Sequence, residues 1–203
     1  MNFKYFIFKR GFDLSVIIFF LPLYFIIMII VSILVYFNFG RPIFFKQDRL
    51  GKNNRIFKLY KFRSMNNNRD ELGNLLPDDQ RLTPFGILLR KTSMDELPAL
   101  INVLKGEMSL VGPRPFLAEY DMLYSPEQRR RHDVLPGITG WAQINGRNNL
   151  KWCDKIKLDL FYIDNISFIF DMQILFRTVF KVFAAKDVSK DSFVTTDKFN
   201  GSN

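Results

Sequence analysis

The first forty residues of the chain are dominated by one long apolar run. No charged residue lies between Leu14 and Gly40, and most of these 27 residues are Ile, Leu, Phe, Val or Met. A helix needs roughly 20 apolar residues to cross a bilayer, so the run is long enough. A cleavable signal peptide fits poorly because no small-x-small cleavage site follows the run. A soluble core helix fits poorly because no polar face interrupts it. The pattern therefore predicts a membrane-inserted segment over residues 1–40.

A proline lies inside this run, and basic residues flank the run on both sides. Pro22 removes one backbone donor and clashes with the preceding turn, so we expect the helix to break there. Lys9 and Arg10 precede the run and Arg41 follows it, and positively charged flanks favour the cytoplasmic side. These features favour a re-entrant helix–break–helix that enters and leaves on the cytoplasmic face. A simple span with a tolerated proline is the alternative.

The pattern changes after residue 41. Pro42–Gln47 and Arg55–Phe62 are rich in β-branched and aromatic residues, and turn residues lie between them at Leu50–Asn54, which predicts an antiparallel hairpin. The polar stretch from Met65 to Gln80 is expected to form a loop or a short helix. Apolar residues recur at helical spacing over Phe168–Phe183 with polar interruptions, which suits a core helix or one in the headgroup layer. The expected fold class is α-rich α+β.

Composition narrows the classes of partner and excludes several kinds of site. The chain has 29 Lys+Arg against 20 Asp+Glu, a formal net charge of +9. Such a charge favours nucleic acid, anionic lipid or a phosphorylated substrate. One Cys and one His exclude a disulfide framework, a Cys-rich zinc site and a His-cluster metal site. The one histidine, His132, follows directly after Arg129–Arg131. These four residues together are expected to form a solvated basic face.

Two adjacent acidic residues at the centre of the chain give the strongest chemical signal. Ser93 followed by Glu96 has the spacing of a capping box, which predicts that a helix starts there. Asp95 and Glu96 would then be first-turn acids that complement the helix dipole. Adjacent side chains lie about 100° apart on a helix, so capping the helix cannot be the whole role of both acids. A helix N-terminus beside Arg90 is also a natural locus for phosphate and metal. Both interpretations stay open on this motif alone.

Two further motifs hold arginines in rigid or glycine-rich segments. Arg114 stands between two prolines in Gly112–Pro115, which restrict its backbone and could aim its guanidinium at phosphate oxygens. The segment Pro136–Arg147 offers free backbone N–H groups and a second guanidinium. Lys61 and Arg63 could add positive charge from the hairpin. Each motif alone is weak, because a Pro-Arg-Pro segment is more often only a rigid surface turn.

In this order, the motifs resemble those of the bacterial sugar transferase family, the monotopic phosphoglycosyl transferases. The matching segments are Lys9–Asp13, the apolar run, Tyr60–Met65, Asp95–Pro98, Ser109–Pro115 and Pro136–Arg147. The resemblance covers nearly the whole chain. The short length and the ending Val194–Gly201 are most similar to the small PglC-type members, which transfer phospho-N,N'-diacetylbacillosamine at the start of protein glycosylation. Family members usually break the membrane helix at a Ser-Pro pair about one turn later than Leu21-Pro22.

The resemblance implies a reaction and a set of site residues. A sugar 1-phosphate would pass from a UDP-sugar, expected to be UDP-N,N'-diacetylbacillosamine, to undecaprenyl phosphate with release of UMP. Asp95 would be the nucleophile that forms a phosphosugar–aspartyl intermediate, and Asp95 and Glu96 would hold Mg²⁺. The expected phosphate and substrate contacts are Lys61, Arg63, Arg90, Pro113, Arg114, Thr139, Gln143 and Arg147.

The resemblance also implies a location and an architecture. The enzyme would be monotopic in the bacterial inner membrane, with a re-entrant hairpin over 1–40. A cytoplasmic catalytic domain over 41–203 would pack on the membrane surface, with interfacial amphipathic helices around its active site. The expected partners are the UDP-sugar, undecaprenyl phosphate and the phospholipid bilayer, with no nucleic acid and with a homo-oligomer left open.

Three alternatives stay open at this level. The same reaction could use another UDP-HexNAc or UDP-hexose for capsule, exopolysaccharide or O-antigen synthesis. A basic, membrane-tethered module that binds anionic lipid would use the same charge and anchor but would not need Asp95 and Glu96. A membrane-anchored nucleic-acid binder ranks last, because the chain lacks the aromatic-plus-glycine pattern of common RNA-binding modules.

Overall fold

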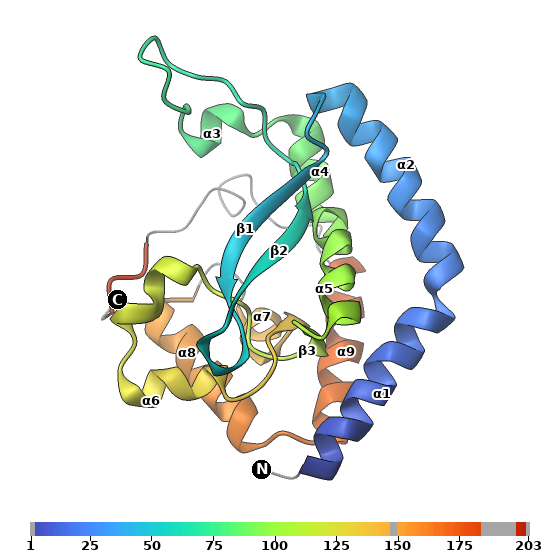
Figure 1. The fold of residues 1–203 in the computed structure, drawn as a ribbon, viewed down its shortest axis with the longest axis vertical. Helices are drawn as coiled ribbons and strands as arrows, with labels where there is room; N and C mark the ends of the chain where they lie inside the picture. The colour runs from blue at the N-terminus through green and yellow to red at the C-terminus, as the bar shows by residue number, and fades with distance from the viewer. Residues whose placement is uncertain (1–2, 147–149, 184–197, 202–203) are drawn as a thin grey trace.

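The computed structural model describes residues 3–146, 150–183 and 198–201 of the chain. Two apolar helices are followed by a β-hairpin and then by a helical body with a second, parallel strand pair (Figure 1). The elements in chain order are α1 (Phe3–Phe19), α2 (Leu21–Phe39), β1 (Phe44–Leu50), η1 (Lys52–Asn54), β2 (Ile56–Phe62), α3 (Asp78–Arg81), α4 (Pro84–Lys91), η2 (Met94–Ala99), α5 (Leu100–Lys105), β3 (Ser109–Val111), η3 (Ala118–Leu123), α6 (Pro126–Arg129), η4 (Arg130–His132), β4 (Gly137–Thr139), α7 (Trp141–Asn145), α8 (Trp152–Asp164) and α9 (Phe168–Phe183).

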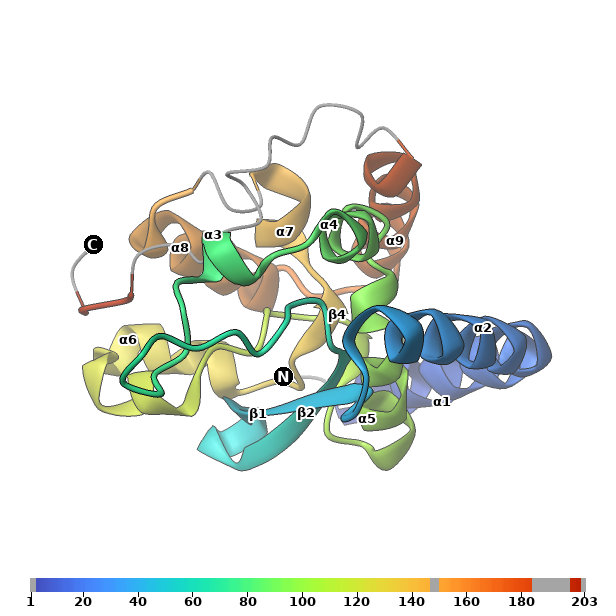
Figure 2. The ribbon, with the colours of Figure 1, turned by 90° about the horizontal axis from the view of Figure 1, so that it is seen from above.

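The helices α1 and α2 meet at Phe20, whose φ and ψ are −90° and 4°. Pro22 is the second residue of α2 and has no N–H to continue the hydrogen-bond ladder of α1. The predicted helix–break–helix is therefore confirmed, with the break two residues before the proline. In Figure 1 the two helices form an angle whose vertex points away from the body, and Figure 2 shows that both project from the same side.

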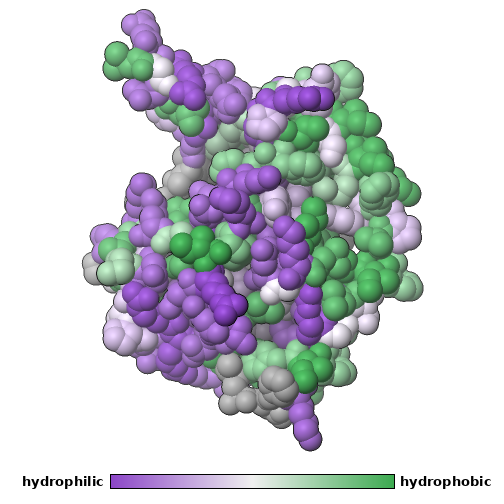
Figure 3. All heavy atoms as spheres, in the orientation of Figure 1, coloured by the Kyte–Doolittle hydropathy of each residue, from purple (hydrophilic) through white to green (hydrophobic). Residues whose placement is uncertain are grey.

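The outer surface of this helix pair is apolar. Within the described residues, α2 is the one helix long and apolar enough to cross a membrane. Val31 and Val35 pack against the body, while most other side chains of α2 are exposed, Phe25 and Ile29 among them. Figure 3 shows hydrophobic residues gathered along this edge and hydrophilic residues over much of the rest of the visible face. Exposed apolar surface of this extent is what a membrane-inserted element presents.

The predicted hairpin is confirmed. β1 and β2 pair antiparallel in a register that runs from Phe44 opposite Phe62 to Leu50 opposite Ile56. Asn53 in the turn has a positive φ of 56°, which Asn tolerates better than most residues. The following polar stretch is a loop that ends in the short helix α3, as expected. The parallel pair β3–β4 was not predicted from the sequence, because each strand has only three residues.

The predicted capping box is wrong. Ser93 has a left-handed backbone with φ 58°, and its side chain makes no capping hydrogen bond. The segment Met94–Ala99 is a 3₁₀ helix with Pro98 inside it, and α5 begins only at Leu100. Because Pro98 has no N–H, a regular first α-turn cannot form across this position. The side chain of Glu96 is consequently free to face other elements.

The helix over Phe168–Phe183 has the bounds that the spacing predicts, and it uses two faces. Ile174 and Asp171 are buried in the body, while Phe176, Val179 and other large apolar side chains are exposed. The buried face therefore packs as expected for a core helix. The exposed apolar face is compatible with the headgroup layer, which stays a prediction.

The expected solvated basic face is wrong for two of its members. Arg131 is 1% exposed and His132 is also buried. Arg131 donates to Asp159 of α8 over 2.6 Å, and its guanidinium carbon lies 3.7 Å from the ring centroid of Phe116. Both partners are distant in sequence, so the local run of basic residues gave no sign of this burial.

Candidate active site

The 3₁₀ helix η2 carries Asp95 and Glu96 and lies against strand β2. Asn102, in the helix α5 that directly follows η2, is fully buried and its side chain both donates to and accepts from the backbone of β2. Its Nδ2 donates to the Lys58 carbonyl over 2.8 Å, and its Oδ1 accepts from the Tyr60 N–H over 3.1 Å. This fixed register brings the next strand residue, Lys61, to the two acids.

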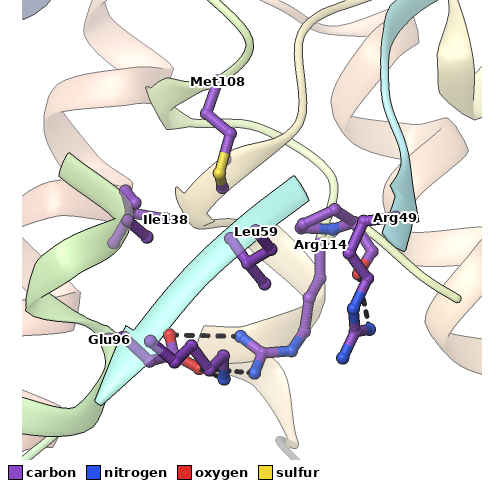
Figure 4. Close-up of a pocket in the computed structure, with 10 residues that line it drawn as sticks. Arg49, Leu59, Glu96, Met108, Arg114 and Ile138 are labelled. Atoms are coloured by element: carbon purple, nitrogen blue, oxygen red, sulfur yellow. Dashed lines mark hydrogen bonds and ion pairs between the residues drawn. The ribbon is translucent and has the colours of Figure 1, made fainter. Parts of the chain in front are cut away.

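Glu96 is held by two cations. Lys61 Nζ lies 2.6 Å from Oε1, and the Arg114 guanidinium reaches Oε1 at 2.6 Å and Oε2 at 3.4 Å (Figure 4). Burial alone would raise the pKa of Glu96, but the charges of Arg114 and Lys61 outweigh it and hold that pKa well below its usual value. Glu96 is therefore a carboxylate at any physiological pH.

Asp95 has the opposite electrostatic setting. It is 7% exposed, and its Oδ2 lies 3.9 Å from Lys61 Nζ. The pKa of Asp95 is raised to about 6, mainly by burial; the neighbouring Glu96 also raises it, and the charges of Lys61, Arg90 and Arg114 partly oppose the shift. At neutral pH the side chain is mostly ionised but poorly solvated, which is the condition of an activated nucleophile.

Arg114 is aimed at Glu96 by the close approach of two loops. A Cβ on Gly112 would lie 2.4 Å from the Leu135 carbonyl oxygen, so only glycine fits there. The Pro113 carbonyl accepts from the Gly137 N–H over 2.9 Å. The Pro-Arg-Pro segment is thus a rigid turn, the simpler of the two interpretations of its sequence. This turn also directs the Arg114 guanidinium toward Glu96.

Arg90 reaches the same region from helix α4. Its Nε donates to Ser64 Oγ over 3.0 Å, and its charge acts on Asp95. The helix approaches the chain after β2 so closely that a Cβ on Gly86 would lie 1.9 Å from the Ser64 carbonyl oxygen. Asp95, Glu96, Lys61, Arg90 and Arg114 together are called the acid–cation cluster below.

Three of the predicted site residues make their side-chain contacts outside this cluster. The Arg63 guanidinium donates to the carbonyls of Gly40 and Arg41, the two residues that follow helix α2, each over 3.1 Å. Thr139 makes a hydroxyl–hydroxyl hydrogen bond of 2.8 Å to Thr178 of α9. Gln143 donates to the Ile138 carbonyl over 2.9 Å. Arg147 lies outside the described residues.

The acid–cation cluster borders a shallow hollow that is open to solvent. Its walls include Lys61, Glu96 and Arg114, together with Arg49, which sequence reasoning did not single out. No local motif marks Arg49, because its approach to the site depends on pairing between β1 and the segment after Arg114. Apolar side chains form much of the remaining wall, among them Leu59, Met108 and Ile138.

The carboxylates of the acid–cation cluster are the candidate ligands for a metal ion. Within the described residues, no group of three or more His, Cys, Asp or Glu side chains is placed to hold a metal ion alone. Mg²⁺ usually takes one or two carboxylates and completes its shell with water and substrate phosphates. The adjacent carboxylates of Asp95 and Glu96 fit an ion shared with a phosphorylated substrate in this way.

Comparison with known proteins gives consistent matches. The family described as bacterial sugar transferase matches residues 4–185. A Bacillus subtilis (strain 168) protein named an uncharacterized sugar transferase, EpsL, is 52% identical over 196 residues, which cover 97% of each chain.

Two longer relatives have names that state a reaction. An Aeromonas hydrophila protein named UDP-N-acetylgalactosamine-undecaprenyl-phosphate N-acetylgalactosaminephosphotransferase is 40% identical over 84% of this chain and 42% of its own. An Escherichia coli (strain K12) protein named UDP-glucose:undecaprenyl-phosphate glucose-1-phosphate transferase is 44% identical over 71% of this chain and 33% of its own. The chain therefore spans less than half of each of these two relatives.

Proposed function

The chain belongs to the bacterial sugar transferase family, and from that premise we propose that it transfers a sugar 1-phosphate from a UDP-sugar to undecaprenyl phosphate. The names of two relatives state this reaction with different sugars. The observation that carries the proposal is the pairing of a permanently charged Glu96 with an Asp95 whose pKa lies near 6, beside three cationic side chains.

We infer a two-step course through Asp95. An Asp95 carboxylate oxygen attacks the phosphorus that bears the sugar, a new P–O bond forms, and the P–O bond to UMP breaks. UMP leaves with that electron pair. A phosphate oxygen of undecaprenyl phosphate then attacks the same phosphorus and releases the Asp95 carboxylate. No proton has to move in either step.

The cationic side chains offset the main electrostatic obstacle. A carboxylate that approaches a diphosphate brings like charges together, at a cost of roughly 4 kcal/mol per unit pair at about 4 Å and an effective dielectric of 20. Lys61, Arg90 and Arg114 provide positive charge around the reacting oxygen. When bound by Asp95 and Glu96, Mg²⁺ would neutralise further charge on the diphosphate.

Contacts at both ends of the α1–α2 pair support the re-entrant topology. In α1, before the uncharged run, Lys9 pairs with Asp171 of α9, and the buried Asp13 accepts from Ser109 Oγ over 2.7 Å. At the end of α2, Arg63 holds the carbonyl of Gly40. Both ends of the hairpin are therefore attached to the same body, which suits a monotopic protein with its body at the cytoplasmic face of the membrane.

Release of UMP over a panel of UDP-sugars tests the reaction and its substrate together. The panel holds UDP-N,N'-diacetylbacillosamine, which the resemblance to small family members favours, and the N-acetylgalactosamine, glucose and galactose analogues. We expect UMP release with at least one of them that depends on undecaprenyl phosphate and on Mg²⁺. No release with any sugar in the presence of both would overturn the proposed function. UMP release with UDP-glucose or UDP-N-acetylgalactosamine alone would identify that compound, and not UDP-N,N'-diacetylbacillosamine, as the substrate.

A further inference from the structure

Arg49 lines the hollow beside Arg114, and it forms no ion pair with any acid of the described residues. It is the second-last residue of β1, and its Nη1 donates to the Pro115 carbonyl over 2.9 Å. Its Nη2 donates to Gln47 Oε1 over 2.5 Å. Both acceptors are neutral, and its buried Nε has no hydrogen-bond partner within the part of the chain that the structure describes. None of the ion pairs among those residues includes Arg49.

The backbone holds Arg49 in this position. Leu50 N–H donates to the Phe116 carbonyl over 3.0 Å, and Arg49 pairs with Leu117 in an antiparallel bridge. The segment after Arg114 therefore lies alongside the end of β1, and the two guanidiniums are presented to one hollow. Burial, together with the charge of Arg114, lowers the pKa of Arg49 to about 10, so the side chain is still cationic at neutral pH.

The charged groups follow an order across the site. The charged neighbours of Asp95 are Lys61, Glu96, Arg90 and Arg114. The charged neighbours of Arg49 are Arg114 and Glu96. Figure 4 shows Arg114 between Glu96 and Arg49. Arg49 thus lies at the end of the site away from the nucleophile.

We propose that Arg49 and Arg114 form a phosphate subsite that is occupied in turn by the phosphate of the leaving UMP and by the phosphate of the incoming lipid. This inference rests on the proposed function. Asp95 forms the P–O bond on one side of the sugar-bearing phosphorus, so the group that leaves and the group that replaces Asp95 both lie opposite it. Both groups are phosphate monoesters, and a guanidinium fork matches their oxygens. As UMP departs, its phosphate gains charge beside a cation that is already in place.

The competing explanation is that Arg49 only braces the Pro115 carbonyl. A brace would lower activity when lost, but it would not distinguish a nucleotide that carries a phosphate from one that lacks it. The comparison of UMP with uridine therefore separates the two roles. Arg55→Gln is the matched control, because it removes one positive charge from the exposed turn of the same hairpin.

The test measures UMP and uridine binding by calorimetry and kcat/KM for each substrate, in wild type, Arg49→Gln, Arg49→Lys and Arg55→Gln. We expect Arg49→Gln to weaken UMP binding about 10- to 100-fold, with uridine binding unchanged. The same variant should lower kcat/KM for the UDP-sugar and for undecaprenyl phosphate by at least about tenfold. Arg49→Lys should recover part of each loss because it keeps the charge, and Arg55→Gln should match wild type.

Each other outcome is decisive. Wild-type UMP affinity in Arg49→Gln overturns the subsite and leaves Arg49 a brace. A loss of kcat/KM for one substrate alone overturns sharing by the two phosphates. If Arg49→Gln does not fold, Arg49→Lys replaces it, and a loss of affinity in that variant that is equal for UMP and for uridine overturns the subsite. Absence of UMP release by wild type with every UDP-sugar is instead the failure of the proposed function.

Discussion

Lys61 Nζ lies 3.9 Å from Asp95 Oδ2, near enough to stabilise the carboxylate charge but beyond hydrogen-bond distance. The same ammonium group is 2.6 Å from Glu96 Oε1. One cation therefore holds Glu96 tightly and Asp95 loosely. The loosely held acid keeps its lone pairs available for attack, whereas the tightly held acid is a fixed charge.

Replacement of Lys61 by Met should shift the acid limb of the pH–rate profile. Lys61 lowers the pKa of Asp95, so its removal leaves more of the carboxyl protonated at a given pH. The wild-type rate should rise through about pH 6, and Lys61→Met should rise at higher pH, with about tenfold or more loss at pH 6. Lys58→Met, an exposed change in the same strand, is the control. An unmoved acid limb in Lys61→Met would contradict the assigned interaction.

Asp95→Asn should stabilise the protein above pH 6 and not near pH 4. The pKa of Asp95 is raised from 3.8 to about 6, so ionisation of the folded protein costs free energy that Asn avoids. The gain in free energy of unfolding is up to about 3 kcal/mol and is complete above pH 6. Thermal unfolding at pH 7.5 and at pH 4.5 checks it, with several degrees expected at the higher pH. A gain that is equal at both pH values would show that burial does not raise this pKa.

The buried Arg131–Asp159 pair should matter for stability and for the position of Arg114. Asp159→Ala leaves the Arg131 charge buried without its partner, at a cost of about 3–5 kcal/mol. Arg130→Gln, which removes exposed ion pairs next to it, should change the stability little, because exposed ion pairs are well solvated. Thermal unfolding distinguishes the two, and a wild-type Tm for Asp159→Ala would contradict the expectation.

A double replacement separates the two roles of this pair. Arg131→Met with Asp159→Leu removes both charges, so most of the lost stability should return. UMP release should stay low, because Arg131 Nη2 no longer donates to the Arg114 carbonyl, which it does over 2.7 Å. Full recovery of activity together with stability would mean that Arg131 does not position Arg114.

The topology of the α1–α2 pair can be measured with single cysteines. Cys153→Ser removes the one native thiol, and Lys4→Cys and Lys46→Cys place exposed thiols before and after the helix pair. In sealed vesicles, a membrane-impermeant maleimide should label both sites from the cytoplasmic face only. Labelling of the two sites from opposite faces would exclude the re-entrant arrangement.

Local patterns were sufficient for the elements that depend on local residues. The apolar run with Pro22, the β-hairpin and the helix Phe168–Phe183 follow from composition and periodicity, and the structure has all three. The capping box failed because Pro98 prevents the regular turn that the Ser93–Glu96 spacing suggests. In that case a second local signal overruled the first.

The site itself was only partly accessible from the sequence. Asp95, Glu96, Lys61, Arg90 and Arg114, which the family resemblance named, lie close together in the structure, and their roles stay predictions. The positions of the remaining arginines are determined by contacts between residues far apart in the sequence. Arg63 binds the chain just after α2, and Arg131 is buried and paired with Asp159, 28 residues along the chain. Arg49 comes to the site through a bridge to Leu117, which no local pattern signals.

Trapping of the sugar phosphate on Asp95 tests the central claim most directly. Wild type and Asp95→Asn are incubated with UDP-sugar labelled in the sugar, with Mg²⁺ and without undecaprenyl phosphate, and intact mass and peptide mapping locate the label. The account predicts one sugar phosphate on wild type, located at Asp95, that is discharged by undecaprenyl phosphate, and none on Asp95→Asn. Equal labelling of both proteins, or normal turnover by Asp95→Asn, would contradict it.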